Sequence, residues 1–202
     1  MHKTVLFFLV LVILCAGCVS LSTFQTARVL QENESQFGVA ASTNSGYTLI
    51  IEEVGEDSIE TITGGTLEAF YRTSISSNFD FGMKAYFVGV VIDGKYQFHD
   101  GERFDMAADL GIGYNKFSSG DSDVTILDFY PTLLMTFDLS KNVDLTFAPK
   151  IIARFVSGPT ETSTLLGGTM MLTFGPLMPE IGYYVSEGDN IATFGVGMNL
   201  NR

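Results

Sequence analysis

Apolar and polar side chains alternate along most of the chain after Ser35, and this pattern constrains the fold more than any other feature. The stretch 103–114 shows the pattern best. Its apolar set is Phe104, Met106, Ala108, Leu110, Ile112 and Tyr114, and its other set is Arg103, Asp105, Ala107, Asp109, Gly111 and Gly113. Because successive side chains of a β-strand point to opposite faces, this period of two predicts a sheet with one apolar and one polar face.

The same alternation predicts ten strands. They are expected at 35–42, 66–74, 79–87, 90–98, 103–114, 124–137, 143–155, 163–174, 177–185 and 191–200. Segments 75–78, 99–102, 138–142 and 175–176 are short connections, whereas 43–65, 115–123, 156–162 and 186–190 are mostly longer. A turn is expected at 88–89. Three prolines, Pro131, Pro149 and Pro179, lie within these strands, and each predicts a bulge or a local break because proline donates no ladder hydrogen bond. The pattern favours an all-β, antiparallel up-and-down barrel of about ten strands, with about eight to twelve possible.

The charged residues within the predicted strands fall on the polar face. They are Glu68, Arg72, Asp80, Lys84, Asp93, Lys95, Arg103, Asp105, Asp109, Asp128, Asp144, Lys150, Arg154 and Glu180. Acids and bases nearly balance, so that enclosed charges could pair with one another. We expect the interior of the barrel to carry Arg72, Lys84, Asp105, Asp109, Asp128, Lys150 and Arg154.

Alternation alone does not say which face is outside. In a transmembrane barrel the apolar face meets lipid, whereas in a lipocalin-like soluble barrel it encloses an apolar ligand. Several strands approach the membrane-crossing length, and aromatic residues such as Phe87, Phe137 and Tyr183 gather near strand ends on the apolar face. The polar face is rich in small residues, and only 17% of the chain is charged. These features favour the transmembrane barrel, and a lipid-anchored carrier of an apolar ligand is the alternative.

The N-terminus has the composition of a secretory signal. Residues 5–15 form an apolar run of signal-peptide length, too short to cross a bilayer as a helix. Ala16 and Gly17 directly precede Cys18, and this pattern resembles the lipobox of bacterial lipoproteins. The resemblance implies a signal peptide at 1–17, acylation of Cys18 with chains such as palmitate, and, because Val19 follows, sorting to the outer membrane. An ordinary cleaved secretory signal is the alternative.

The rest of the chain divides into two parts. Residues 18–34 are predicted to be the lipid anchor and a polar tether, with the anchor in the inner leaflet, and residues 35–202 to be the barrel. The whole pattern resembles the small bacterial outer-membrane β-barrels as a class. That resemblance implies a location in the outer membrane and contact with outer-membrane lipid. It also implies recognition by the barrel-assembly and lipoprotein-sorting machinery.

No catalytic constellation, cofactor motif or metal-ligand set is predicted. His99 is expected in a short turn beside Asp100, away from the end of the barrel where outer-membrane enzymes place their catalytic groups. The acidic run Glu52, Glu53, Glu56, Asp57 and Glu60 is expected in a long solvated loop or a protruding hairpin around Gly55, with cation binding as the alternative. The net charge of −12 argues against nucleic acid. We therefore expect a non-enzymatic outer-membrane lipoprotein with a structural, surface-interaction or narrow-transport role and a closed, charge-lined interior.

Overall fold

The computed structural model describes residues 20–53, 56–119, 122–157, 162–187 and 190–201. The described residues form ten strands: β1 (Ser35–Glu53), β2 (Glu56–Ser76), β3 (Phe79–Tyr86), β4 (Gly89–Asp100), β5 (Phe104–Ser119), β6 (Ser122–Ser140), β7 (Val143–Val156), β8 (Thr162–Phe174), β9 (Leu177–Val185) and β10 (Asn190–Asn199). Each strand pairs antiparallel with its neighbours in the chain, and β1 pairs with β10 to close a barrel. The predicted up-and-down barrel of ten strands is confirmed.

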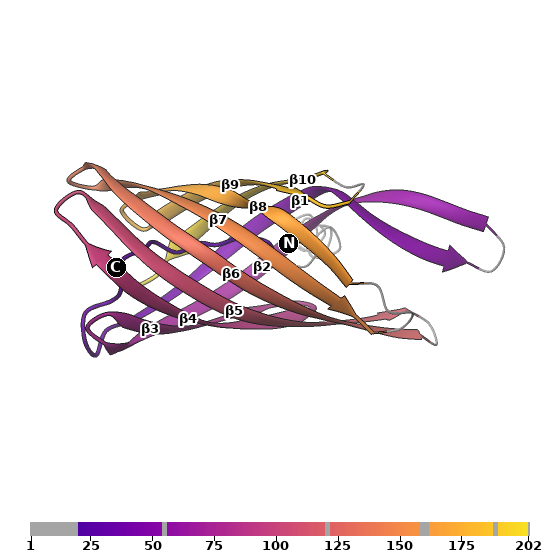
Figure 1. The fold of residues 1–202 in the computed structure, drawn as a ribbon, viewed down its shortest axis with the longest axis horizontal. Coiled ribbons are helices and arrows are strands. Elements are labelled where there is room, and N and C mark those ends of the chain that lie inside the picture. Colours follow the sequence, from indigo (N-terminus) through magenta and orange to yellow (C-terminus); the bar gives the residue numbers. More distant parts are fainter. Residues whose placement is uncertain (1–19, 54–55, 120–121, 158–161, 188–189, 202) are drawn as a thin grey trace, which may run out of the picture.

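The barrel has two distinct ends (Figure 1). At one, which we call the short-turn end, residues 77–78, 101–103, 141–142 and 175–176 connect the strands. At the other, the long-loop end, β3 joins β4 through residues 87–88 and the remaining connections contain residues outside the described ranges. The tight β3–β4 connection lies next to the predicted turn at 88–89.

Strands β1 and β2 continue past the barrel as a two-stranded ribbon that projects from the long-loop end (Figure 1). The prediction that segment 43–65 is a loop is therefore wrong for most of its residues. The other possibility, a protruding hairpin, describes the segment better. Pairing runs from Tyr47 opposite Ile62 to Glu53 opposite Glu56, after an irregularity between Asn44 and Tyr47. Residues of high β-propensity, such as Tyr47 and Ile62, allow this extension.

The prolines within strands produce the predicted local breaks and no bulges: β6 and β7 are unpaired around Pro131 and Pro149, and β8 and β9 around Pro179. The partner offset is the same for Phe129 opposite Ala153 as for Thr132 opposite Lys150, so that β6 passes Pro131 without a change of register. Register shifts occur instead near the short-turn end, in pairings of β2 with β3, β4 with β5 and β6 with β7. A missing donor thus costs a ladder hydrogen bond here without adding a residue to the strand.

The apolar face points outward. In β5, Leu110 and Ile112 are 50% and 45% exposed, whereas Asp105 and Asp109 on the other face are 2% and 7% exposed. Arg103 is an exception to the predicted set, because β5 begins at Phe104 and Arg103 lies exposed in the preceding turn. No helix in the described part of the chain is long and apolar enough to cross a bilayer.

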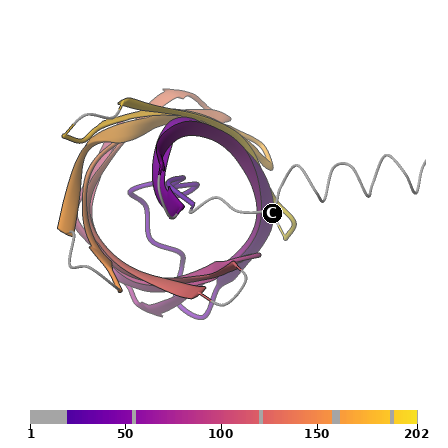
Figure 2. The ribbon, with the colours of Figure 1, turned by 90° about the vertical axis from the view of Figure 1, so that its right-hand side faces the viewer.

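The interior of the barrel is occupied by the chain itself. Residues 20–30 form an irregular segment that runs through the lumen, seen as the indigo trace inside the ring in Figure 2. Residues 20–30 thus differ from the tether predicted for 18–34, and residues 18–19 lie outside the described residues. Residues 31–34 are exposed and lead from the lumen into β1 at the short-turn end. Ser35 begins β1, as predicted.

Candidate functional site: the barrel interior

We call residues 20–30 the luminal segment. Its first residues lie towards the long-loop end, where Leu21 packs in a cluster with Tyr86 and Tyr184, each at or next to the last residue of its strand. Its last residue lies towards the short-turn end, where the backbone N–H of Leu30 donates to the carboxylate of Asp80 at 3.2 Å, near the start of β3. The luminal segment therefore crosses the barrel from one end towards the other.

Lysine ammonium groups of the wall bind backbone carbonyls of the luminal segment near the long-loop end. Lys150 donates to the carbonyl of Leu21 at 3.2 Å, and Lys84 donates to the carbonyl of Ser22 at 2.8 Å. The hydroxyl of Tyr184 also donates to the carbonyl of Leu21, at 2.8 Å. Because the segment has no partner strand, these wall groups take the place of the ladder bonds that a strand would make.

Glu68 binds the luminal segment through a side chain. The hydroxyl of Ser22 lies 2.9 Å from both carboxylate oxygens of Glu68, and Lys84 lies 3.4 Å from the same carboxylate. Ser42 of β1 also donates to Glu68, at 2.9 Å. The carboxylate is thus paired and hydrogen-bonded, as a buried charge requires.

Glu180 holds the backbone of the luminal segment where it bends. Its carboxylate accepts from the backbone N–H of Thr23 at 2.9 Å and from that of Phe24 at 3.0 Å. Phe24 has a φ of 42°, in the left-handed region that a bulky residue rarely adopts. Two charge-assisted hydrogen bonds to adjacent N–H groups stabilise this conformation and offset its cost, which is about 1–3 kcal/mol.

The ring of Phe24 fits into a socket of the wall made by two glycines of β10. A Cβ atom added to Gly195 would lie 2.7 Å from the ring of Phe24, and one added to Gly197 would lie 2.9 Å from it. The ring packs in a buried cluster with Phe70 and Met178. Gly195 and Gly197 therefore leave space on the inner face, and the ring of Phe24 occupies it.

Acidic groups of the wall surround Arg28 towards the short-turn end. Its guanidinium pairs with Asp105 at 2.8 Å, with Asp144 at 3.0 Å and with Asp138. Lys95, paired with Asp80 at 3.2 Å, donates to the backbone carbonyls of Thr26 and Arg28. Between these contacts and Phe24, the N–H of Ala27 donates to the hydroxyl of Thr136 at 2.8 Å. Charged side chains of the wall thus contact the luminal segment along its length, and Arg28 supplies the one charge of the segment itself.

Other charges pair within the wall. Arg154 binds both carboxylate oxygens of Asp128, at 2.7 and 2.8 Å, and the hydroxyl of Tyr130 donates to the same carboxylate at 3.0 Å. Arg72 of β2 pairs with Asp93 of β4 over Gly82 of β3, the strand between them. The bidentate pair of Arg154 with Asp128 fixes both side chains in one arrangement, in which they bind each other and not the luminal segment.

The structure places all seven residues predicted to be interior charges on the inner face of the barrel. They are Arg72, Lys84, Asp105, Asp109, Asp128, Lys150 and Arg154. Lys84, Lys150 and Asp105 contact the luminal segment directly, and the amide of Gln25 donates to Asp109 at 2.9 Å.

Sequence reasoning missed the partners of these charges in the luminal segment. One signal was available: Leu21, Phe24, Ala27 and Leu30 recur at every third position, and Arg28 is the one charged residue from 20 to 30. The predicted acylation site, Cys18, lies outside the described residues. The side chains of the acidic run from Glu52 to Glu60 lie outside them too. His99 lies at the short-turn end of β4, its ring 5.7 Å from that of Phe104.

Little empty space remains in the lumen. A cavity beside the luminal segment, lined by residues that include Gln25, Asp109 and Lys150, has a volume of about 30 Å³. A cavity of that volume has room for a few water molecules. Within the described ranges, no three His, Cys, Asp or Glu side chains are grouped so that they could hold a metal ion.

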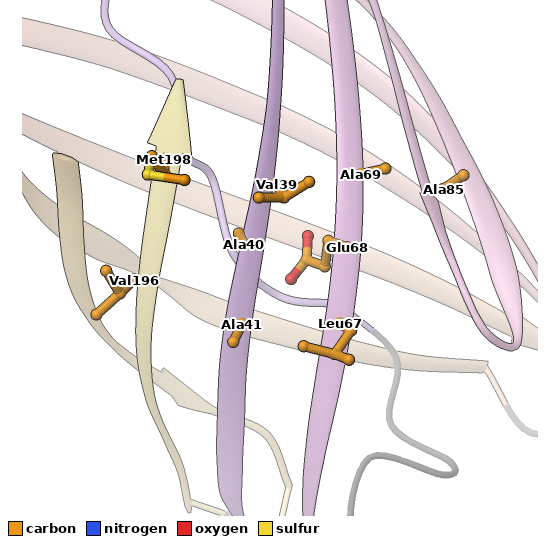
Figure 3. Close-up of a pocket in the computed structure, with 9 residues that line it drawn as sticks. All are labelled: Val39, Ala40, Ala41, Leu67, Glu68, Ala69, Ala85, Val196 and Met198. Carbon is orange, nitrogen blue, oxygen red and sulfur yellow. The ribbon is translucent and has the colours of Figure 1, made fainter. Parts of the chain in front are cut away.

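A second depression lies on the outside of the wall (Figure 3). It has a volume of about 550 Å³, and its lining comes from β1, β2, β3 and β10. The outward-facing lining residues are Val39, Ala41, Leu67, Ala69, Ala85, Val196 and Met198. Three alanines among larger side chains make the surface hollow here, so that the depression is part of the apolar outer surface.

Comparison with models of protein families gives no match, and comparison with curated proteins gives none either. Among solved structures, the β domain of the Bordetella autotransporter BrkA is similar, with a TM-score of 0.50 and 10% identity over 81% of this chain and 98% of that one. The COG4313 outer-membrane channel of Pseudomonas putida F1 gives a TM-score of 0.45 at 9% identity, over 90% of this chain and 100% of that one. Ail, the attachment invasion locus protein of Yersinia pestis, gives 0.34 at 15% identity, over 84% and 100%. This chain therefore has the fold of the bacterial outer-membrane β-barrels.

Proposed function

We propose that this protein is a lipid-anchored outer-membrane barrel that is closed by its own luminal segment and has a structural or surface-interaction role without catalysis. The observation that carries the proposal is the continuous set of contacts between residues 20–30 and the charged wall, from Lys150 to Asp80. A lumen filled in this way leaves no path for a solute, so a surface role is favoured over narrow transport.

The location in the membrane is supported by the outer surface. Large apolar side chains of every strand are exposed there; among them are Phe37, Tyr71, Phe81, Ile92, Leu110, Phe129, Phe147, Leu166, Ile181 and Phe194. Exposed apolar surface of this extent is stable in lipid and not in water. The lipocalin-like alternative is wrong, because that architecture encloses the apolar face and exposes the polar one.

Planar lipid bilayers provide the test. The wild-type protein is expected to give no stable conductance, whereas a chain with residues 21–30 replaced by glycine and serine is expected to conduct ions, because the wall then encloses water. A matched control replaces the exposed residues 31–34 in the same way and is expected to stay closed. Migration on a denaturing gel before and after boiling checks that each variant folds. A large stable conductance of the wild-type protein would refute closure, whatever the variants do.

A further inference from the structure

The direction of the luminal segment determines the end at which the chain before Ser20 leaves the barrel. We infer that it leaves at the long-loop end, so that the acylated Cys18 of the proposed function is anchored on the outer side of the membrane. The acylation of Cys18 is taken from the proposed function, whereas the direction of the chain follows from the contacts of the described residues. It differs from the expectation that the anchor lies in the inner leaflet.

The contacts of the segment follow one another in order along the barrel. Leu21 bonds to Tyr184, the residue before the last of β9, and packs against Ile191, the second residue of β10. Arg28 pairs with Asp105, the second residue of β5, and with Asp144, the second residue of β7. The first pair of strand positions borders the long-loop end and the second borders the short-turn end. The chain therefore descends from the long-loop end as its residue number rises.

Ser20, the first described residue, is near the rim of the long-loop end. Its hydroxyl lies 2.9 Å from that of Ser22 and accepts from Lys84 at 3.2 Å. Lys84 is two residues from the end of β3 at Tyr86. Cys18 is two positions before Ser20, and an extended chain covers at most about 7 Å over two positions. Cys18 is thus within reach of the rim.

A return to the short-turn end is too long for this piece of chain. The nine residues of β9 correspond to roughly 20 Å along the axis of a barrel, given about 3.3 Å per residue and a strand tilt of about 40°. Two residues cover about a third of that distance. A returning chain would also need a second path through a lumen in which the cavity beside the segment is only about 30 Å³.

The rim of the long-loop end is lower at the β3–β4 connection, beside Ser20, than at the neighbouring strands. The β3–β4 connection consists of residues 87–88, whereas β5 continues from Asn115, opposite Gly89, to Ser119. The neighbour on the other side, β2, belongs to the projecting ribbon (Figure 1). Phe87, at the top of this low stretch, is 82% exposed, so the rim there carries an apolar side chain. Acyl chains on Cys18 can cross at this point and enter the lipid beside β3.

The side on which the long-loop end lies follows from the general build of such barrels. Bacterial outer-membrane barrels place short turns in the periplasm and longer loops outside. The four short connections and the C-terminal end of β10 share the short-turn end, opposite the ribbon. Cys18 and the ribbon would then face the outside of the cell together.

Epitope tags on whole cells test the inference. One variant carries the tag between Val19 and Ser20, a second between Lys141 and Asn142 at the short-turn end, and a third in the β7–β8 connection, between Gly158 and Pro159. Antibody is expected to bind the first and third tags on intact cells and the second only after the outer membrane is permeabilised. The change of migration on boiling confirms that each tagged chain forms its barrel.

The outcomes separate the inference from the proposed function. A tag before Ser20 that needs permeabilisation overturns the inference, whether the β7–β8 tag is accessible or not. Incorporation of an alkyne-labelled palmitate, expected in the wild type and in Cys15→Ser but lost in Cys18→Ser, tests the lipid anchor. Failure of that labelling with a surface-exposed N-terminal tag would refute the acylated anchor and retain the direction of the chain.

Discussion

Phe24 links the luminal segment to the wall through its ring and its backbone at once. The ring occupies the space left by Gly195 and Gly197, and the N–H beside it is bound by Glu180. Both contacts act on one residue, whose backbone has a left-handed φ. At this position the sequence separation of the partners exceeds 150 residues.

The dependence of Gly197 on Phe24 can be measured in a double-mutant cycle. Gly197→Ala is expected to lower the free energy of unfolding by about 1–3 kcal/mol, because the added methyl overlaps the ring of Phe24. In a Phe24→Ala background, the same substitution is expected to cost almost nothing. Urea unfolding in detergent micelles, followed by circular dichroism, gives both values.

Gly113→Ala is the matched control for that cycle. Its methyl would lie 2.8 Å from the ring of Tyr130, which is a different contact of the wall. The cost of Gly113→Ala should therefore be the same with and without Phe24. If Gly197→Ala were equally costly in both backgrounds, the socket for Phe24 would be refuted.

At the scale of elements, the luminal segment is an extended stretch of chain that has no partner strand. The ten strands satisfy their backbones through the ladder, whereas residues 20–30 depend on side chains of the wall. Arg28 is an example, because three carboxylates of the wall bind its one guanidinium. Hydrogen bonds and ion pairs from side chains of the wall therefore replace, for the segment, the backbone pairing of a strand.

Removal of the Arg28 charge is expected to loosen this element. Arg28→Met should lower the free energy of unfolding by about 1–3 kcal/mol, because Asp105, Asp138 and Asp144 lose their common donor. Arg28→Lys should retain part of the stability, because lysine supplies the charge without the planar fork. Arg103→Met, at an exposed position in the neighbouring turn, should change stability by less than about 0.5 kcal/mol.

Urea titrations at low and high salt would compare the three variants. The deficit of Arg28→Met should shrink at high salt, because Arg28 is one-third exposed and its pairs are partly screened in the wild type. Equal stability of Arg28→Met and Arg103→Met at low salt would contradict the role given to Arg28.

Which elements the sequence predicts depends on how local their signal is. Alternation is a property of adjacent residues, and it predicted the strand from Phe104 onward and the inward position of Asp109. The strands of the ribbon were predicted to be a loop, with a protruding hairpin as the other possibility, because Ser45-Gly46 and Gly64-Gly65 interrupt the alternation just where β1 and β2 leave the barrel. The luminal segment was missed because its structure is set by contacts with distant strands, and the recurrence of an apolar residue at every third position does not identify those strands.

At the scale of the whole molecule, the protein is an antiparallel barrel whose lumen is occupied by its own luminal segment. Apolar side chains cover the outside, charged side chains line the inside, and the charges of the wall are neutralised partly by one another and partly by residues 20–30. In our proposals, residues 20–30 close the barrel and set the side on which the N-terminal part of the chain emerges. The proposed closure and the proposed position of the anchor thus follow from one arrangement.

Nuclear Overhauser spectroscopy of the protein in lipid nanodiscs tests this arrangement most directly. The ring protons of Phe24 should show cross-peaks to the Hα protons of Gly195 and Gly197, and the methyl groups of Leu110 should show cross-peaks to lipid acyl chains. A Phe24 ring without contact to either glycine, or Leu110 methyl groups in contact with luminal residues instead of lipid, would contradict the account.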